Sequence, residues 1–221
     1  MKKIITIVII IITLIALIFI KNTYKSFKFG NNISNKSVEK IVQYILDINS
    51  YEAQAKVTVE SNKNTNVYLV KEIYVKDNNT FKQEILEPQN LNGIFFVYDG
   101  SKLKLENSKW NLSKIYENYP YIGENTVTLI GFIKDYREAE ESNISEKENK
   151  IILETKLKNG NKYVAYKKLY INRTTGIPEK LEIQDITQKN VIYILYNEIK
   201  INSLQREDIL AFKIKELTND I

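Results

Sequence analysis

An alternation of apolar and polar residues with a period of two runs through most of the chain after residue 50 and constrains its fold more than any other feature. In the first segment every second residue is apolar: Ala53, Ala55, Val57 and Val59. Successive side chains of a strand point to opposite faces, so this pattern indicates a half-buried strand. Short polar turns separate the segments, and Asp99-Gly100 is typical of a tight hairpin. The pattern predicts an antiparallel sheet, hairpin after hairpin, with one face buried.

The predicted strands form two runs on either side of a helical interval. The first run comprises residues 51–60, 67–75, 81–86, 94–98 and 102–106, and the second comprises 151–157, 163–171, 180–184 and 191–201. Two helices are expected in the interval, at 113–119 and 126–140. The second of these carries one apolar side: Leu129, Ile130, Phe132, Ile133 and Tyr136. Residues 206–221 are expected to close the sheet as a last strand or a short helix.

A further helix is expected before the sheet. Ser37 is suited to cap it, and Glu39 lies in the first turn, where the helix dipole favours an acidic side chain. Its apolar residues recur at helical spacing: Val38, Ile41, Val42, Ile45 and Ile48. We expect this face to pack on the sheet, and a groove on a partner is the alternative.

An apolar run occupies residues 4–20, between Lys3 and Lys21. A spanning helix needs about 17 to 25 residues of this kind. No small-residue cleavage site follows, which favours a retained membrane anchor over a cleaved secretory signal, the alternative. The anchor residues are Ile4, Ile5, Ile9, Ile12, Leu14, Leu17 and Ile20. The expected organisation is an anchor at 1–21, a linker at 22–35 and one folded domain at 36–221.

The net charge of +5 belongs to the region around the anchor. Residues 1–50 carry seven lysines and two acidic residues, whereas the rest of the chain carries 25 basic and 25 acidic side chains. Lysines beside an apolar run can meet anionic lipid headgroups. A domain without net charge lacks the electrostatic footprint of a nucleic-acid-binding protein. We therefore expect a membrane partner and no nucleic acid.

The chain contains no cysteine and no histidine. Disulfides, zinc–cysteine sites and thiol catalysis are excluded, and the commonest general base is missing. The carboxylate groups that could serve a hydrolase are Glu182 with Asp185, and the run Glu138, Glu140 and Glu141. The first pair lies at a strand end and the second group is typical of a solvated face. We predict a protein that is not an enzyme and has no metal or cofactor.

Aromatic residues are the remaining candidates for a site. Three tyrosines surround a proline in one short loop: Tyr116, Tyr119, Pro120 and Tyr121. These rings either cap the core or form an exposed surface that binds a partner, because tyrosine is enriched at interface hot spots. The other large aromatics are assigned to the core: Phe81, Phe95, Phe96 and Trp110. Of these, Trp110 alone could lie at a lid.

The order of these elements resembles the LolA-like superfamily, in which about eleven strands form an open half-barrel with packed helices. Five segments are similar to the germination lipoprotein GerS family: residues 48–53 (INSYEA), 86–93 (LEPQNLNG), 115–121 (IYENYPY), 175–183 (TGIPEKLEI) and 195–202 (LYNEIKIN). The resemblance implies a mainly β (α+β) fold: an N-terminal transmembrane helix, then an antiparallel half-barrel sheet.

The GerS resemblance also implies a function. Proteins of that family are exported, tethered to a membrane, and partner and activate a cortex N-acetylmuramoyl-L-alanine amidase in spore-forming bacteria. This chain lacks the lipobox cysteine, so the apolar helix would replace the lipid, with the domain outside the cell membrane. The alternative is a LolA-like carrier that binds acyl chains in the half-barrel cavity. Such carriers use an arginine on an early strand, and here no arginine lies between Tyr51 and Asn107.

Overall fold

The computed structural model describes residues 37–61, 63–76, 79–107, 109–119 and 127–204. Two helices lie within this part of the chain, α2 (Val38–Leu46) and α3 (Leu129–Glu138). The strands that precede α3 are β1 (Ser50–Glu60), β2 (Thr65–Val75), β3 (Thr80–Glu87), β4 (Ile94–Tyr98), β5 (Leu103–Asn107) and β6 (Leu112–Tyr116). Those that follow it are β7 (Ser142–Lys147), β8 (Lys150–Lys156), β9 (Tyr166–Asn172), β10 (Pro178–Gln184) and β11 (Asn190–Ile201).

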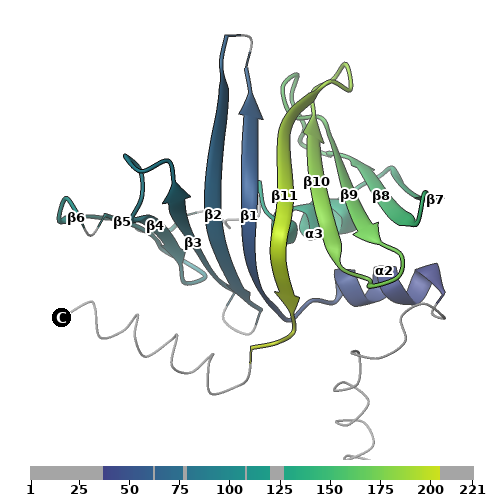
Figure 1. Cartoon of the computed structure of the whole chain (residues 1–221), viewed down its shortest axis with the longest axis horizontal. Helices are drawn as coiled ribbons and strands as arrows, with labels where there is room; N and C mark the ends of the chain where they lie inside the picture. The colour runs from purple at the N-terminus through teal and green to yellow at the C-terminus, as the bar shows by residue number, and fades with distance from the viewer. Residues whose placement is uncertain (1–36, 62, 77–78, 108, 120–126, 205–221) are drawn as a thin grey trace, which may run out of the picture. The chain divides into compact units, whose positions relative to one another are not determined.

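All eleven strands belong to one antiparallel sheet. Their order is β6-β5-β4-β3-β2-β1-β11-β10-β9-β8-β7 (Figure 1). Strands that are adjacent in the sheet are also consecutive in sequence, except for the central pair of β1 and β11. The sheet consists of two meanders, one on each side of the α3 segment, joined along this central pair. The predicted antiparallel, mainly β architecture is therefore confirmed. The sheet stays open, with β6 and β7 as its two edges.

The central pair shows why the alternating pattern is so clear. Tyr51 lies opposite Ile201 at one end of the pair and Val59 opposite Ile192 at the other. Every second residue of β1 is buried, from Tyr51 through Ala53, Ala55 and Val57. The side chain of Asn202 secures the end of β11, since its Oδ1 accepts hydrogen bonds from the backbone nitrogens of Asn49 and Ser50 at 2.8 and 3.2 Å.

Helix α3 covers one face of the sheet, which we call the α3 face (Figure 1). The helix starts where Thr128 caps it, with Oγ1 accepting from the backbone nitrogen of Gly131 at 3.2 Å. Its apolar residues are buried as expected: Leu129, Ile130, Phe132 and Ile133. Arg137 donates to the carbonyl oxygen of Leu46 at 2.7 Å and to Asp47 at 2.8 Å. The arginine thus satisfies a carbonyl at the end of α2 that has no partner within that helix.

Two segments differ from the sequence expectation. Residues 113–119, expected to be helical, include the strand β6, which pairs with β5 from Leu103↔Tyr116 to Asn107↔Leu112. Strand β7 was not expected, because it has one apolar residue, Ile144, and so no alternation to detect. It forms through its hairpin with β8, whose turn holds Glu148 and Asn149 at positive φ. In both cases strand pairing overrides a weak local pattern.

The predicted anchor at 1–21 and the linker at 22–35 lie outside the described residues, as do residues 205–221. Among the residues that the structure describes, no helix is long and apolar enough to cross a membrane. The helix expected at the start of the domain is confirmed as α2, with Ile41, Val42 and Ile45 buried.

Replacement of Asn202 tests how the central pair is closed. We expect Asn202→Ala to lower the free energy of unfolding by about 1–2 kcal/mol, because two backbone N–H groups lose their acceptor. Asn202→Asp keeps an oxygen at the same place and should remain close to the parent protein. Urea unfolding monitored by circular dichroism measures both. Equal losses in the two variants would contradict this role of the Oδ1 atom.

Candidate functional site

Four of the ten exposed large apolar side chains of the described residues lie on the hairpin formed by β5 and β6. All five residues of β6 are exposed. Four large side chains contribute, with exposed fractions of 64%, 47%, 48% and 38%: Trp110, Leu112, Ile115 and Tyr116. We call these four residues the β6 wing. Single exposed apolar residues are ordinary on protein surfaces, but four within seven residues of one hairpin make it the candidate interaction site.

Strand register distributes the β6 wing over both faces of the sheet. Tyr116 lies opposite Leu103, which is buried on the α3 face, so Leu112 and Tyr116 share that face. Ile115 points to the outer face. One backbone edge of β6 pairs with β5, and no strand of the described residues pairs with the other. The wing therefore presents apolar side chains on two faces around a free strand edge.

The hairpin that carries the wing is held by backbone and side-chain hydrogen bonds. Asn107 is buried, and its Oδ1 accepts from the backbone nitrogens of Lys109 and Trp110 at 2.9 and 3.2 Å. Asn111 adopts a positive φ of 50°, which an asparagine tolerates in a turn. At the other end, the backbone nitrogen of Tyr119 donates to the carbonyl of Ser101 at 2.9 Å. These contacts orient the exposed side chains.

The predicted tyrosine loop is only partly described. The rings of Tyr116 and Tyr119 meet edge to face with centroids 6.3 Å apart, and Tyr119 is half-buried whereas Tyr116 is exposed. Pro120 and Tyr121 lie outside the described residues. The aromatic residues assigned to the core divide: Phe81 is buried, Phe95 and Phe96 are half-buried, and Trp110 is exposed. Trp110 lies in the turn between β5 and β6 with 64% of its surface exposed, so its assignment to the core is wrong.

Positive charge accompanies the β6 wing. Lys102 pairs with Glu117 at 3.1 Å and Lys104 with Glu106 at 2.7 Å. Two further lysines of the hairpin contact no carboxylate of the described residues. Lys109 donates to the amide oxygen of Asn92 at 2.9 Å, and the ammonium group of Lys114 lies 4.8 Å from the centre of the Tyr116 ring. The hairpin therefore carries a net positive charge.

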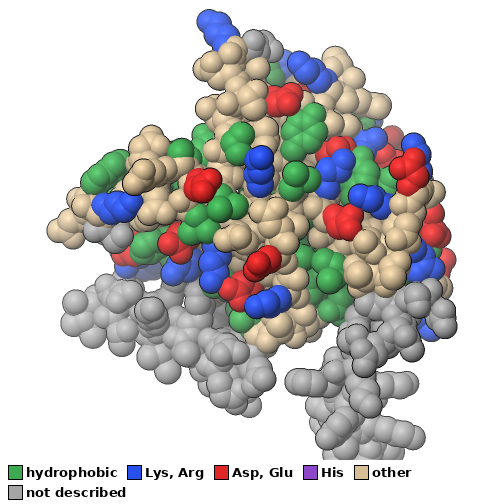
Figure 2. All heavy atoms as spheres, in the orientation of Figure 1, with side chains coloured by type: hydrophobic (Ala, Val, Ile, Leu, Met, Phe, Trp, Pro, Cys, Tyr) green, Lys and Arg blue, Asp and Glu red, His purple; other side chains and the backbone are tan. Residues whose placement is uncertain are grey.

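The opposite edge of the sheet has a different character. β7 carries one large apolar residue, Ile144, which is 44% exposed. Polar Asn143 and Ser145 flank it, the charged Glu146 and Lys147 follow, and Glu146 pairs with Arg173 at 3.3 Å. Charged edge strands resist pairing with other strands. On the face seen in Figure 2, acidic and basic side chains are interleaved, in agreement with the balanced charge of the domain.

A buried carboxylate lies beneath α3, and sequence reasoning missed it. The side chain of Glu72 is fully buried, and it accepts hydrogen bonds from Gln83 at 2.9 Å and from the Tyr51 hydroxyl at 3.2 Å. Burial raises its pKa to about 7, because the charged carboxylate loses its contact with water. The Tyr51 oxygen also accepts from the backbone of Ile130. The sequence hid it, because Val67, Leu69, Ile73 and Val75 alternate on the other face of β2, whereas Glu72 shares its face with buried Val70 and Tyr74.

The carboxylates considered for catalysis have structural partners instead. Glu182 accepts from Lys180 at 2.7 Å and from the Tyr170 hydroxyl at 2.8 Å, while Asp185 accepts three bonds within its own turn, from Thr187 and Lys189. The run Glu138, Glu140 and Glu141 is exposed, as a solvated face should be. These groups do not form two converging carboxyls of the kind glycoside hydrolysis needs.

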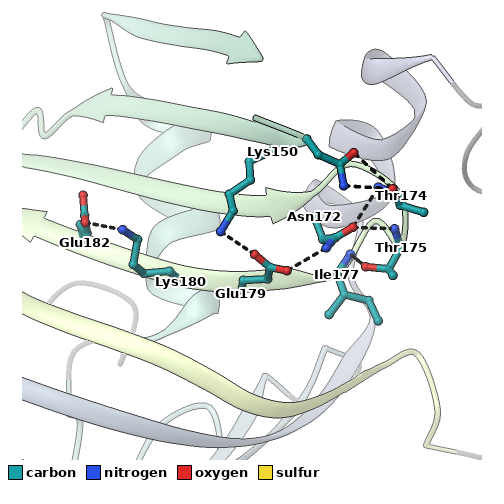
Figure 3. Close-up of polar contacts among 9 residues, drawn as sticks. Lys150, Asn172, Thr174, Thr175, Ile177, Glu179, Lys180 and Glu182 are labelled. Atoms are coloured by element: carbon teal, nitrogen blue, oxygen red, sulfur yellow. Dashed lines mark hydrogen bonds and ion pairs between the residues drawn. The ribbon is translucent and has the colours of Figure 1, made fainter. Parts of the chain in front are cut away.

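Figure 3 shows how the segment at 175–183, one of those similar to GerS proteins, is built. Asn172 accepts from the backbone nitrogens of Thr174 and Thr175 at 2.9 and 3.0 Å, and it donates to Glu179 at 2.8 Å. Lys150 pairs with Glu179 at 2.9 Å. The segment forms a rigid turn entering β10, so its residue pattern reflects the fold.

A hollow of about 410 Å³ lies beside α3. Its polar rim includes Lys134, Asp135 and Glu138, and its apolar side includes Leu157, Val164 and Ile183. Within it Lys167 is almost fully buried, 2.5 Å from Asp135. The pair joins β9 to α3. Among the described residues, no group of three acidic side chains is arranged to hold a metal ion.

Comparison with known families assigns the class of protein. The family model described as "Sporulation protein YdcC-like" matches residues 1–210. The chain therefore belongs to the YdcC-like family of sporulation proteins. No curated protein matches the chain significantly in sequence.

Several solved structures are similar to the chain. An uncharacterized conserved protein from Thermus thermophilus is 14% identical, with a TM-score of 0.50 over 77% of this chain and 90% of that one. A chain in the structure of the CwlD amidase from Clostridioides difficile in complex with the GerS lipoprotein is 25% identical, with a TM-score of 0.43 over 77% and 96%. A LolA superfamily protein from Nitrosomonas europaea is 12% identical, with a TM-score of 0.43 over 78% and 96%.

The buried Glu72 makes a pH-dependent contribution to stability. Its pKa is raised from 4.5 to about 7 in the folded state, so the folded protein binds the proton more tightly. The stabilisation is complete below pH 4.5 and is lost as the pH rises to 7, by about 3 kcal/mol in all. We expect Glu72→Gln to abolish this contribution.

Urea unfolding of both proteins between pH 4 and 8 measures it. The difference in unfolding free energy between Glu72→Gln and the parent should move in favour of the variant as the pH rises, and then level off above pH 7. Parallel stability curves would show that Glu72 titrates normally in the folded state.

Proposed function

We propose that this chain is a membrane-tethered, extracytoplasmic binding module without catalytic activity, and that it binds and activates a cell-wall N-acetylmuramoyl-L-alanine amidase during sporulation. The observation that carries the proposal is the β6 wing. It displays Trp110 and Tyr116, which belong to the residue types enriched in binding hot spots, on a rigid hairpin. Membership of a sporulation family supports a role for such a surface in the spore envelope.

The identity of the partner rests on the sequence. The five segments at 48–53, 86–93, 115–121, 175–183 and 195–202 resemble the GerS family, whose members act on such an amidase. One of the five, at 115–121, includes exposed residues of the β6 wing. The similarity thus extends to a surface that the fold does not need for its core.

The tether and the absence of catalysis have separate support. The apolar run at 4–20, flanked by lysines, suits a membrane anchor that holds the domain at the outer side of the cell membrane. The carboxylates Glu179 and Glu182 are engaged by lysines of the sheet, and Glu72 is sealed beneath α3. A module that binds an enzyme needs an exposed surface more than reactive groups, and the wing supplies one.

A carrier of acyl chains is the second candidate, favoured by apolar side chains on the α3 face. Ile85, Phe96 and Leu105 share that face with buried Phe81 and are only half-buried themselves. An acyl chain laid across them would remove this surface from water. Organic extraction of the purified full-length protein, followed by mass spectrometry, tests the idea. A stoichiometric lipid would support a carrier, and its absence would leave the binding module.

The amidase proposal is tested by co-purification. The full-length chain in detergent is mixed with the sporulation amidase of the same organism, and complex formation and amidase activity on peptidoglycan are measured. We expect a stable complex at micromolar concentrations and higher activity than that of the amidase alone. The proposal would be refuted if a monodisperse amidase did not bind the chain and its activity were the same with and without the chain.

A matched pair of alanine variants locates the interface. Trp110→Ala should weaken the complex by about 10- to 30-fold, because a buried hot-spot tryptophan contributes about 2 kcal/mol. Tyr163→Ala is the control, since Tyr163 is 65% exposed against 64% for Trp110 and lies in the other meander. Equal effects of the two variants would show that the wing is not the contact surface.

A further inference from the structure

Within the part of the chain that the structure describes, β6 has one edge that pairs with no strand. Its residues pair with β5 on one side, from Asn107↔Leu112 to Leu103↔Tyr116. The groups on the other side face no strand of the described residues. Such an edge is a template for an added strand, which supplies main-chain hydrogen bonds while side-chain contacts provide specificity.

The two edges of the sheet differ in how they treat an incoming strand. β7 has a single apolar residue, Ile144, and ends in the charged pair Glu146 and Lys147, which disfavours pairing at that end. β6 has no acidic residue and carries apolar side chains on both faces, Leu112 and Tyr116 on one and Ile115 on the other. Lysine is one of the residues that block natural edge strands, so Lys114 leaves the β6 edge open only to a strand that can meet its charge.

The positive charge of the hairpin indicates what kind of segment could pair with β6. Lys114 stands between Leu112 and Tyr116 on the α3 face, and Lys109 lies at the adjoining turn. Neither contacts a carboxylate of the described residues. An acidic residue directly opposite Lys114 would form a favourable cross-strand pair, whereas a like charge there is destabilising.

We infer that β6 receives an extended segment of a partner protein by strand addition, and that this segment is apolar at alternate positions with an acidic residue opposite Lys114. The inference rests on the proposed function, because it names the surface by which the binding module would hold its partner. A second copy of this chain fits less well. Full antiparallel overlap of two β6 strands would set Lys114 against Lys114.

The single tryptophan of the chain provides the measurement. Trp110 is exposed and lies two residues before Leu112, at the start of β6, so an added strand would change its surroundings. The probe is a tryptophan-free peptide, Val-Thr-Val-Thr-Glu-Thr-Val-Thr-Val, titrated into the full-length protein in detergent. The matched peptide has lysine in place of the central glutamate. A third peptide is N-methylated at alternate residues and cannot complete the ladder.

We expect the glutamate peptide to shift Trp110 emission to shorter wavelength and to bind about fivefold more tightly than the lysine peptide, as one cross-strand charge pair allows. Lys114→Glu should reverse the order of the two peptides. The N-methylated peptide should not bind. Equal affinities for all three peptides, or no response to the glutamate peptide, would overturn the inference.

Two other occupants would also be recognised. A variant ending at Leu204 that binds the glutamate peptide when the full chain does not would assign the edge to residues 205–221 and overturn the partner segment. A concentration-dependent dimer in sedimentation equilibrium, lost in Ile115→Lys, would assign it to a second copy, with the same consequence.

A matched pair of edge variants separates this inference from the amidase proposal. Ile115→Lys on β6 and Ile144→Lys on β7 replace the same residue type at similar exposure, 48% and 44%. We expect Ile115→Lys to weaken peptide and amidase binding at least tenfold, and Ile144→Lys to leave both unchanged. Amidase binding that is indifferent to Ile115→Lys would refute the edge and keep the module. Peptide binding without amidase binding would keep the edge and refute the amidase.

Discussion

The pairing of β1 with β11 is the interaction on which the rest of the domain depends. It joins two meanders that are separated by more than a hundred residues and turns them into one sheet. A non-local pair of this kind must offset the entropy of closing the intervening chain. Three features offset this entropy: the many paired residues of β1 and β11, the burial of Ala55 and Val57, and the hydrogen bonds that Asn202 accepts at the end of the pair. Without this pair, each meander would have an additional open edge.

Helix α3 depends on the joined sheet. Its Asp135 binds Lys167 of the second meander, while Ile130 reaches Tyr51 of the first. Arg137 ties the same helix to the end of α2. The buried Glu72 lies beneath this junction and introduces a polar group into the core, with hydrogen bonds but no cation. Such a group makes the core sensitive to pH, since its charged form is poorly solvated.

Because the sheet does not close into a barrel, it has two edge strands, β6 and β7. Each edge strand of an open sheet must be blocked, covered or used. The charged residues Glu146 and Lys147 lie at the end of β7. By contrast, β6 displays Leu112 and Tyr116 on one face, with Lys114 between them, and Ile115 on the other face. Because the hairpin that carries β6 is held by Asn107, the exposed side chains are presented in a defined geometry. The two edges of the sheet therefore differ in the side chains that they present.

The sequence by itself determined the sheet, since the alternation along β1 and the turn at Asp99-Gly100 identify strands and hairpins without reference to distant residues. Its helical periods identified α2 and α3 in the same way. Only the tertiary structure decided that Leu112 to Tyr116 would be a strand, because a short stretch of mixed residues takes the structure that pairing with β5 imposes. It also decided that Trp110 would be exposed and Glu72 buried. Burial depends on what lies opposite a residue in space, which periodicity along the chain does not contain.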